Sequence, residues 1–157
     1  MAKSRPAEAL KQARQIDDPW FRAQALTWVA RFADIDVIRI SAEAARAAAE
    51  GRDKYQQCAV CAWEIVALAE REYQSEASKR LREALNLAKH VEPVASRGEA
   101  LFLLLQAGAR IAPDDAEDVY DMLKNLCGAE GHWRCQRAVR KAAKIMSGEL
   151  QPRPFFW

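Results

Sequence analysis

The side chains of this sequence best suited to chemistry are its cysteines and one of its histidines. Cys58 and Cys61 form a CxxC pair, and three further possible ligands lie towards the C-terminus: Cys127, His132 and Cys135. Cysteine thiolates and histidine nitrogens are usual ligands of a tetrahedral zinc ion, and a CxxC pair at the start of a helix is a usual redox motif. Zinc binding and thiol–disulfide exchange are therefore the two chemistries to consider.

The spacing of these residues argues against both chemistries. Cys58 and Cys61 take the positions that Ala23 and Leu26 take in an internal repeat, where core residues are expected. The two C-terminal cysteines belong to a repeat two further along, and helices about 8–10 Å apart place the two pairs about 20 Å from each other. The CxxC pair also lies several residues inside a predicted helix. We expect four buried cysteines, no metal site and no other cofactor.

The elements that position these residues come from the internal repeat. A helical segment that begins at Asp18 returns from Asp53, from about residue 93 and, in weaker form, from Trp133. The copies are matched on four apolar residues, at spacings of 35, 40 and 38 positions: Leu26, Cys61, Leu101 and Val139. This spacing is the length of two helices with two short turns, and such a period is typical of stacked helical hairpins.

The sequence therefore predicts an all-α fold, an α-α superhelix of about four antiparallel helical hairpins in one domain over residues 1–151. The hairpins are expected at about 6–33, 35–72, 75–111 and 113–147. The two helices of the first hairpin are expected at about 6–16 and 19–33. No segment alternates polar and apolar residues as a strand does. Asp18 followed by Pro19 is a typical helix start. The helix expected at 19–33 is apolar almost all round, as an interior helix of a stack is.

The segment Asp18-Pro19-x-x-Arg22-Ala23-x-Ala25-Leu26 resembles the second helix of HEAT-type repeats, with an acidic start and an arginine one turn later. The general texture of residues 6–147 also resembles divergent bacterial tetratricopeptide-like repeats, without their period of about 34 residues. Arg22 recurs as Arg97 and is replaced by Gln57 in the second copy. The resemblance implies a superhelix whose concave face binds macromolecules.

That concave face supplies the first set of candidate site residues. The expected polar contacts to a partner are Arg22, Gln57 and Arg97. Trp28 and Trp63 occupy equivalent positions and are the expected apolar contacts, unless both belong to the core. No phosphate-binding loop, nucleophile–base pair or metal set is recognisable. The leading interpretation is a non-enzymatic protein–protein interaction module.

The last predicted helix, about 132–147, supplies a second set. Five cations fall within one sector of about 120° on this helix: Arg134, Arg137, Arg140, Lys141 and Lys144. Such a face can follow a phosphate backbone, so the alternative function is a nucleic-acid-binding helical repeat. The remaining interpretation is a solvated outer face, neutralised by acids of the preceding helix.

Residues 152–157 form an aromatic C-terminal tail that ends in Phe155, Phe156 and Trp157. Three consecutive exposed aromatic residues favour aggregation, so we expect them to pack against protein. One possible place is the open face of the last hairpin of the same chain. The others are a groove in a second copy and a groove in a different partner. Pro152 and Pro154 keep the tail extended.

Charge and hydropathy place few further limits on function. The formal net charge of +2 is too small for the overall field to select a partner. The longest apolar stretch is far shorter than the ~20 residues that span a bilayer, and no signal peptide is expected at the N-terminus. We therefore expect a cytoplasmic protein without membrane association.

Overall fold

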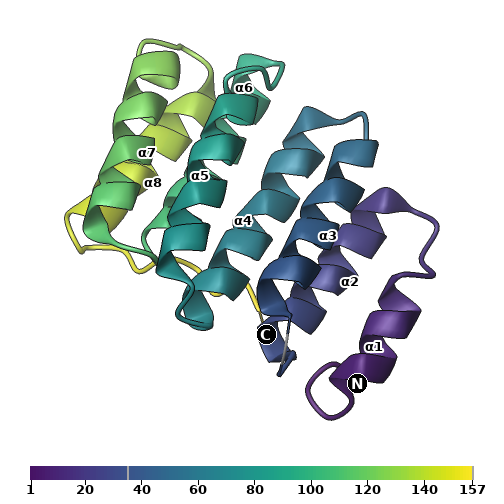
Figure 1. Ribbon diagram of the computed structural model, residues 1–157. Helices are drawn as coiled ribbons and strands as arrows, with labels where there is room; N and C mark the ends of the chain where they lie inside the picture. Colours follow the sequence, from purple (N-terminus) through teal and green to yellow (C-terminus); the bar gives the residue numbers. More distant parts are fainter. Residues whose placement is uncertain (35, 157) are drawn as a thin grey trace.

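The computed structural model describes residues 1–34 and 36–156, and all regular secondary structure in these two ranges is helical. Antiparallel helices stack side by side along the molecule (Figure 1), which confirms the predicted all-α superhelix of helical hairpins. The helices of the described residues are α1 (Pro6–Ala13), α2 (Pro19–Phe32), α3 (Val37–Glu50), α4 (Lys54–Glu70), α5 (Gln74–Ala88), α6 (Val94–Gly108), α7 (Pro113–Cys127) and α8 (Trp133–Met146).

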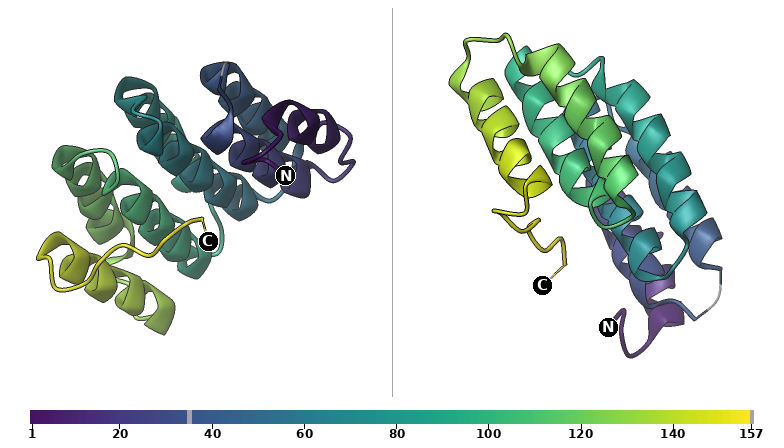
Figure 2. Two further views of the ribbon diagram at one scale, coloured as in Figure 1. Left: turned by 90° about the horizontal axis from the view of Figure 1, so that it is seen from below. Right: turned by 90° about the vertical axis from the view of Figure 1, so that its left-hand side faces the viewer.

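The helices form two layers. Figure 2 shows α3, α5 and α7 in one layer and α2, α4, α6 and α8 in the other. Each even-numbered helix from α2 to α6 packs against the next even-numbered helix and against its neighbours in the odd-numbered layer. These helices are consequently buried on several sides: in α4, every residue from Cys58 to Ala69 except Trp63 is buried. A helix in that position has to be apolar almost all round.

Local capping explains where several helices begin and end. Asp18 Oδ1 accepts a hydrogen bond from Phe21 N at 3.1 Å, and Asp53 Oδ1 accepts one from Gln56 N at 2.9 Å. These bonds satisfy amide groups that have no partner inside the helix. α1 ends at Ala13 and α6 at Gly108, each a few residues before the predicted end. Both continue as a tighter turn with i→i−3 bonds, such as Arg110 N to Ala107 O at 3.0 Å, which α-helices often make at their ends.

The four cysteines are buried and free, as the repeat register predicts. Cys58 and Cys61 lie on α4, whereas Cys127 lies on α7 and Cys135 on α8. Across residues 1–34 and 36–156, no group of three or more His, Cys, Asp or Glu side chains is arranged to hold a metal ion. In the same two ranges, no helix is both long and apolar enough to cross a membrane.

The C-terminal tail packs on its own chain, but not on the open face of the last hairpin. After α8 the chain turns at Gly148, with φ of 79°, and runs back across the layer of even-numbered helices (Figure 2). Phe155 and Phe156 are buried against α2 and α4, so the predicted cap over the last hairpin is wrong. The buried residues of α8 are small (Cys135, Ala138 and Ala142), and its face offers less aromatic surface than Trp28 and Trp63. The predicted packing of Trp157 lies outside the described residues.

Candidate functional site: the groove of the even-numbered helices

The four even-numbered helices line a groove, and the tail crosses it. The open part of the groove is a cavity of about 600 Å³. Residues at two positions of the repeat face the groove, one turn apart. The first position is taken by Gln24, Ala59, Glu99 and Arg137, and the second by Trp28, Trp63, Leu103 and Lys141. The wall thus changes from aromatic over α2 and α4 to charged over α6 and α8.

The tail occupies the aromatic half of the groove. The Phe156 ring lies edge-on to Trp63 with the ring centroids 5.2 Å apart, and the Phe155 ring lies edge-on to the same indole at 6.3 Å. Trp28 and Trp63 are themselves 6.4 Å apart, so the structure brings together the two tryptophans that the sequence singled out. Edge-to-face packing is a favoured arrangement of aromatic rings, because the positive edge of one faces the negative face of the other.

Arg31 places a positive charge against the aromatic half of the groove. Its guanidinium carbon lies 4.4 Å from the centroid of the Phe156 ring, which is within the range of a cation–π interaction. The same guanidinium donates from Nε to Glu70 at 2.5 Å. Arg31 therefore joins α2, α4 and the tail. Arg31 was not a candidate residue in the sequence, although it stands one turn after Trp28 on the same helix.

The groove also binds the backbone of the tail. Gln106, which is only 4% exposed, accepts a hydrogen bond from Arg153 N at 3.1 Å. Arg110 donates to the carbonyl oxygens of Pro152 and Arg153 at 3.4 and 3.2 Å. An extended segment has no internal hydrogen bonds, and Gln106 and Arg110 supply partners to its backbone groups. Neither Gln106 nor Arg110 was a candidate residue in the sequence.

Arg22, Gln57 and Arg97 are used inside the repeat. Each donates to the carbonyl oxygen of the residue six positions earlier, at the end of the preceding turn. The acceptors are Ile16 for Arg22 at 2.9 Å, Gly51 for Gln57, and Val91 for Arg97 at 3.1 Å. Arg22 and Arg97 also pair with Glu50 and Glu92. These bonds tie the start of each helix to the turn before it, and the predicted contact of the three side chains with a partner stays a prediction.

The five cations of α8 separate into two groups. Arg137 and Lys141 line the groove, and Arg137 donates to Glu99 on α6 at 2.5 Å. Arg134, Arg140 and Lys144 are exposed outside the lining of the cavity. The guanidinium carbons of Arg134 and Arg137 lie 5.5 and 4.9 Å from the ring of the exposed Trp133. Within the described chain, no ion pair joins this face to the acids of α7, and the solvated face stays one of the interpretations.

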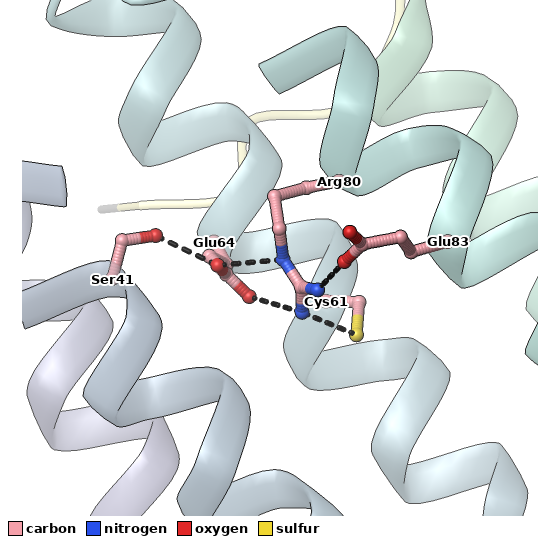
Figure 3. A network of polar contacts seen from close by, with 5 residues as sticks. All are labelled: Ser41, Cys61, Glu64, Arg80 and Glu83. Carbon is pink, nitrogen blue, oxygen red and sulfur yellow. Dashed lines mark hydrogen bonds and ion pairs between the residues drawn. The ribbon is translucent and has the colours of Figure 1, made fainter. Parts of the chain in front are cut away.

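A buried polar cluster lies on the opposite side of α4 (Figure 3). Glu64, 1% exposed, accepts hydrogen bonds from Ser41 Oγ at 2.7 Å and from Arg80 Nε and Nη2 at 2.9 and 3.0 Å. Arg80 also pairs with Glu83 and donates to Cys61 Sγ at 3.7 Å. Burial raises the pKa of Glu64, and the guanidinium of Arg80 opposes that rise. The cluster joins α3, α4 and α5 beside a crevice of about 340 Å³.

Glu64 was not a candidate residue in the sequence. This acid stands in an otherwise apolar run, and its partners come from helices on either side in the sequence. An isolated acid inside an apolar helix is the one signal that was available, because a carboxylate is rarely buried without partners. The carboxylate accepts three hydrogen bonds from side chains of α3 and α5, which indicates a link between repeats.

The thiols are poor candidates for chemistry. Burial raises the pKa of Cys58, Cys61 and Cys127 to about 12. The reactive form of cysteine is the thiolate, and at neutral pH these three thiols remain protonated. The groove remains the candidate site, because it combines an open cavity, aromatic side chains and a cation without an acidic partner in the described residues.

No family model, curated protein or solved structure matches this chain. The resemblance to HEAT-type and tetratricopeptide-like repeats stays a prediction.

Proposed function

We propose that this protein is a non-enzymatic interaction module whose groove binds an extended segment of a partner protein. One observation supports this function above all: the chain's own tail lies in that groove, with Phe155 and Phe156 buried on Trp28 and Trp63. A segment arriving from another protein can make the same contacts as one that is covalently attached. Stacked helical repeats commonly use such an extended surface for binding.

The contacts of the tail indicate what the groove recognises. Gln106 and Arg110 bond backbone groups, and such bonds are available to any extended sequence. The two tryptophans and Arg31 contact rings, and these contacts select for aromatic side chains. Backbone bonds that provide affinity and pockets that select side chains together make a recurring mode of peptide recognition. The proposed ligand is therefore an extended segment with two adjacent aromatic residues.

The proposal includes a HEAT-like fold class and a cytoplasmic location. The fold class is supported by the paired helices and by the Asp18-Pro19 start of α2 with Arg22 one turn later. The location is supported by four cysteines that remain free, whereas secreted proteins usually pair theirs.

A nucleic-acid-binding module is the second candidate. It is favoured by four side chains of α8 that have no acidic partner in the described part of the chain: Arg134, Arg140, Lys141 and Lys144. Binding through such a face weakens steeply with salt because phosphate counterions are released. Salt dependence therefore separates this candidate from recognition of aromatic residues.

The test uses the full chain with Phe155→Ala and Phe156→Ala. Ordering each tail residue costs about 1–2 kcal/mol, whereas each hydrogen bond that remains contributes only about 0.5–1.5 kcal/mol. The tail of this variant should consequently leave the groove. A fluorescein-labelled synthetic peptide with the sequence of residues 149–157 is then titrated into the variant and into the unchanged protein, and its anisotropy is followed.

The peptide should bind the variant and should bind the unchanged protein at least ~10-fold more weakly, because an attached tail competes at a millimolar effective concentration. A peptide with alanine at both phenylalanine positions is the matched control and should not bind. Failure of the tail peptide to bind the variant would exclude the proposed function. A labelled single-stranded oligonucleotide that binds in its place would support the second candidate.

A further inference from the structure

The open half of the groove carries a positive charge, which recognition of aromatic residues does not involve. The charged side chains that the helices contribute to its lining are two cations and one carboxylate: Arg137, Lys141 and Glu99. The carboxylate is already bonded to Arg137 at 2.5 Å. Lys141 is exposed and has no ion pair within the described residues. Lys141 therefore gives the open half of the groove a positive charge that no acid of the described residues pairs with.

The course of the tail shows which part of a ligand reaches that charge. The tail runs from the end of α8 back across the layer of even-numbered helices (Figure 2). It contacts Gln106 on α6 and reaches Trp63 on α4 and Trp28 on α2. Leu150 and Gln151, which precede the aromatic pair, line the same cavity as Lys141. In a ligand that runs in the same direction, the residues before its aromatic pair face this lysine.

We propose that the open half of the groove binds an acidic stretch, which lies on the N-terminal side of the aromatic pair in the partner segment. This inference rests on the proposed function and adds the charge of the ligand to it. Opposite charges in a partly enclosed groove attract more strongly than on an open surface, because the low-dielectric walls reduce screening. Lys141 is the residue that contacts the acidic side chains of the ligand.

A protein segment fits this half better than a nucleic acid does. Gln24 on α2 and Gln106 on α6 line the cavity, and Gln106 already binds a peptide backbone. The cavity of about 600 Å³ lies in the range of pockets that hold small ligands, about 300–1,000 Å³. Arg140 and Lys144, which a phosphate backbone along α8 would contact, lie outside the lining.

The experiment compares three labelled peptides in the full chain with Phe155→Ala and Phe156→Ala. Each peptide has the tail sequence of residues 151–157, preceded by a short run of glutamate, of serine or of lysine. At low salt the glutamate peptide should bind about 10-fold more tightly than the serine peptide, and the lysine peptide should bind most weakly. Raising the salt should reduce these differences, because ions screen exposed charges.

Two charge reversals on α8 locate the effect. Lys141→Glu should abolish the advantage of the glutamate peptide. Lys144→Glu makes the same change of charge one turn further along, outside the cavity, and should preserve most of that advantage. Both variants should bind the serine peptide as before, which shows that they fold and that the aromatic site is intact.

The outcomes separate this inference from the function on which it rests. Equal binding of the three peptides would overturn the inference, while binding of the serine peptide would keep the proposed function. An equal loss in the two reversal variants would also overturn it, because the charge effect would then belong to the whole face of α8. Binding of none of the three peptides would overturn both proposals.

Discussion

The ring of Phe156 stands edge-on to the ring of Trp28, with centroids 4.9 Å apart and planes at 78°. One residue belongs to the end of the chain and the other to its second helix, so the contact joins the tail to the first hairpin. On the same phenylalanine, the guanidinium of Arg31 lies 4.4 Å from the ring centroid. The tail is therefore part of the folded structure as well as an occupant of the groove.

The first prediction concerns this contact. Replacing Phe155 and Phe156 by alanine should lower the free energy of unfolding by about 2–4 kcal/mol, since burying one such side chain contributes about 1.5–3 kcal/mol and the released tail regains entropy. For a chain of this size that corresponds to a melting temperature lower by about 4–16 °C. The emission of Trp28 and Trp63 should shift to the red as water reaches them.

Phe21→Ala is the matched control, because this phenylalanine is 58% exposed on α2. It should change the melting temperature by no more than a degree or two, in line with most surface substitutions. Equal melting of the tail variant and the unchanged protein would show that the tail contributes nothing to folding.

The second prediction concerns Arg97. Its side chain bonds Val91 O and pairs with Glu92 on the turn before α6. Arg97→Ala should therefore lower the free energy of unfolding by about 1–2 kcal/mol, measured by urea denaturation, and should leave binding of the tail peptide unchanged. Weaker peptide binding at unchanged stability would return Arg97 to the surface that contacts the partner.

The third prediction concerns the buried pair of Glu64 and Arg80. Arg80→Ala leaves a carboxylate that is 1% exposed without its cation and should cost about 3–5 kcal/mol. Glu64→Ala should cost less, because Arg80 is 21% exposed and keeps Glu83. Replacing both residues together, by leucine and methionine, should restore much of the stability. The free energy of unfolding of each variant is measured by urea denaturation. If the loss in the double variant equalled the sum of the losses in the two single variants, the two side chains would not be coupled.

The fourth prediction concerns alkaline pH. The thiols of Cys58 and Cys61 ionise near pH 9.0 when exposed, and burial raises their pKa to about 12 in the folded chain. Between these values the unfolded state has lost protons that the folded state keeps, so the free energy of unfolding falls as pH rises. The slope approaches about 1.4 kcal/mol per pH unit for each thiol. Cys58→Ala with Cys61→Ala should flatten the decline in urea midpoints above about pH 9, and parallel curves would refute the assignment.

The sequence predicted the fold well because the repeat is a local pattern. Helix starts such as Asp18-Pro19 and the apolar residues at repeat spacing depend on neighbours in the sequence, and these determine a helical hairpin. The repeat also gave Trp28 and Trp63 equivalent positions, and the structure brings their ring centroids within 6.4 Å. The sequence did not show which residues cover the two tryptophans, because Phe155 and Phe156 lie far from both in the sequence.

The polar residues show the limit of that reasoning. A recurring arginine at one repeat position suits a partner contact and a bond to the preceding turn equally well, and only the structure shows Arg22 and Arg97 bonded to carbonyl oxygens. The sequence contains weaker indications of the roles of Gln106 and Glu64 than of the role of the recurring arginine. Their roles depend on the tail and on α5, and periodicity within one helix carries no information about either.

Photo-crosslinking tests the central claim most directly. A synthetic peptide of residues 149–157 carries p-benzoylphenylalanine at the position of Phe156 and is irradiated with the full-length Phe155→Ala and Phe156→Ala variant. The sites of attachment are then mapped by mass spectrometry. We expect adducts on α2 and α4, around Trp28 and Trp63, and far fewer on the unchanged protein, whose own tail fills the groove. Adducts on the outer face of α8, or equal labelling of the two proteins, would contradict the assignment of this groove as the binding site.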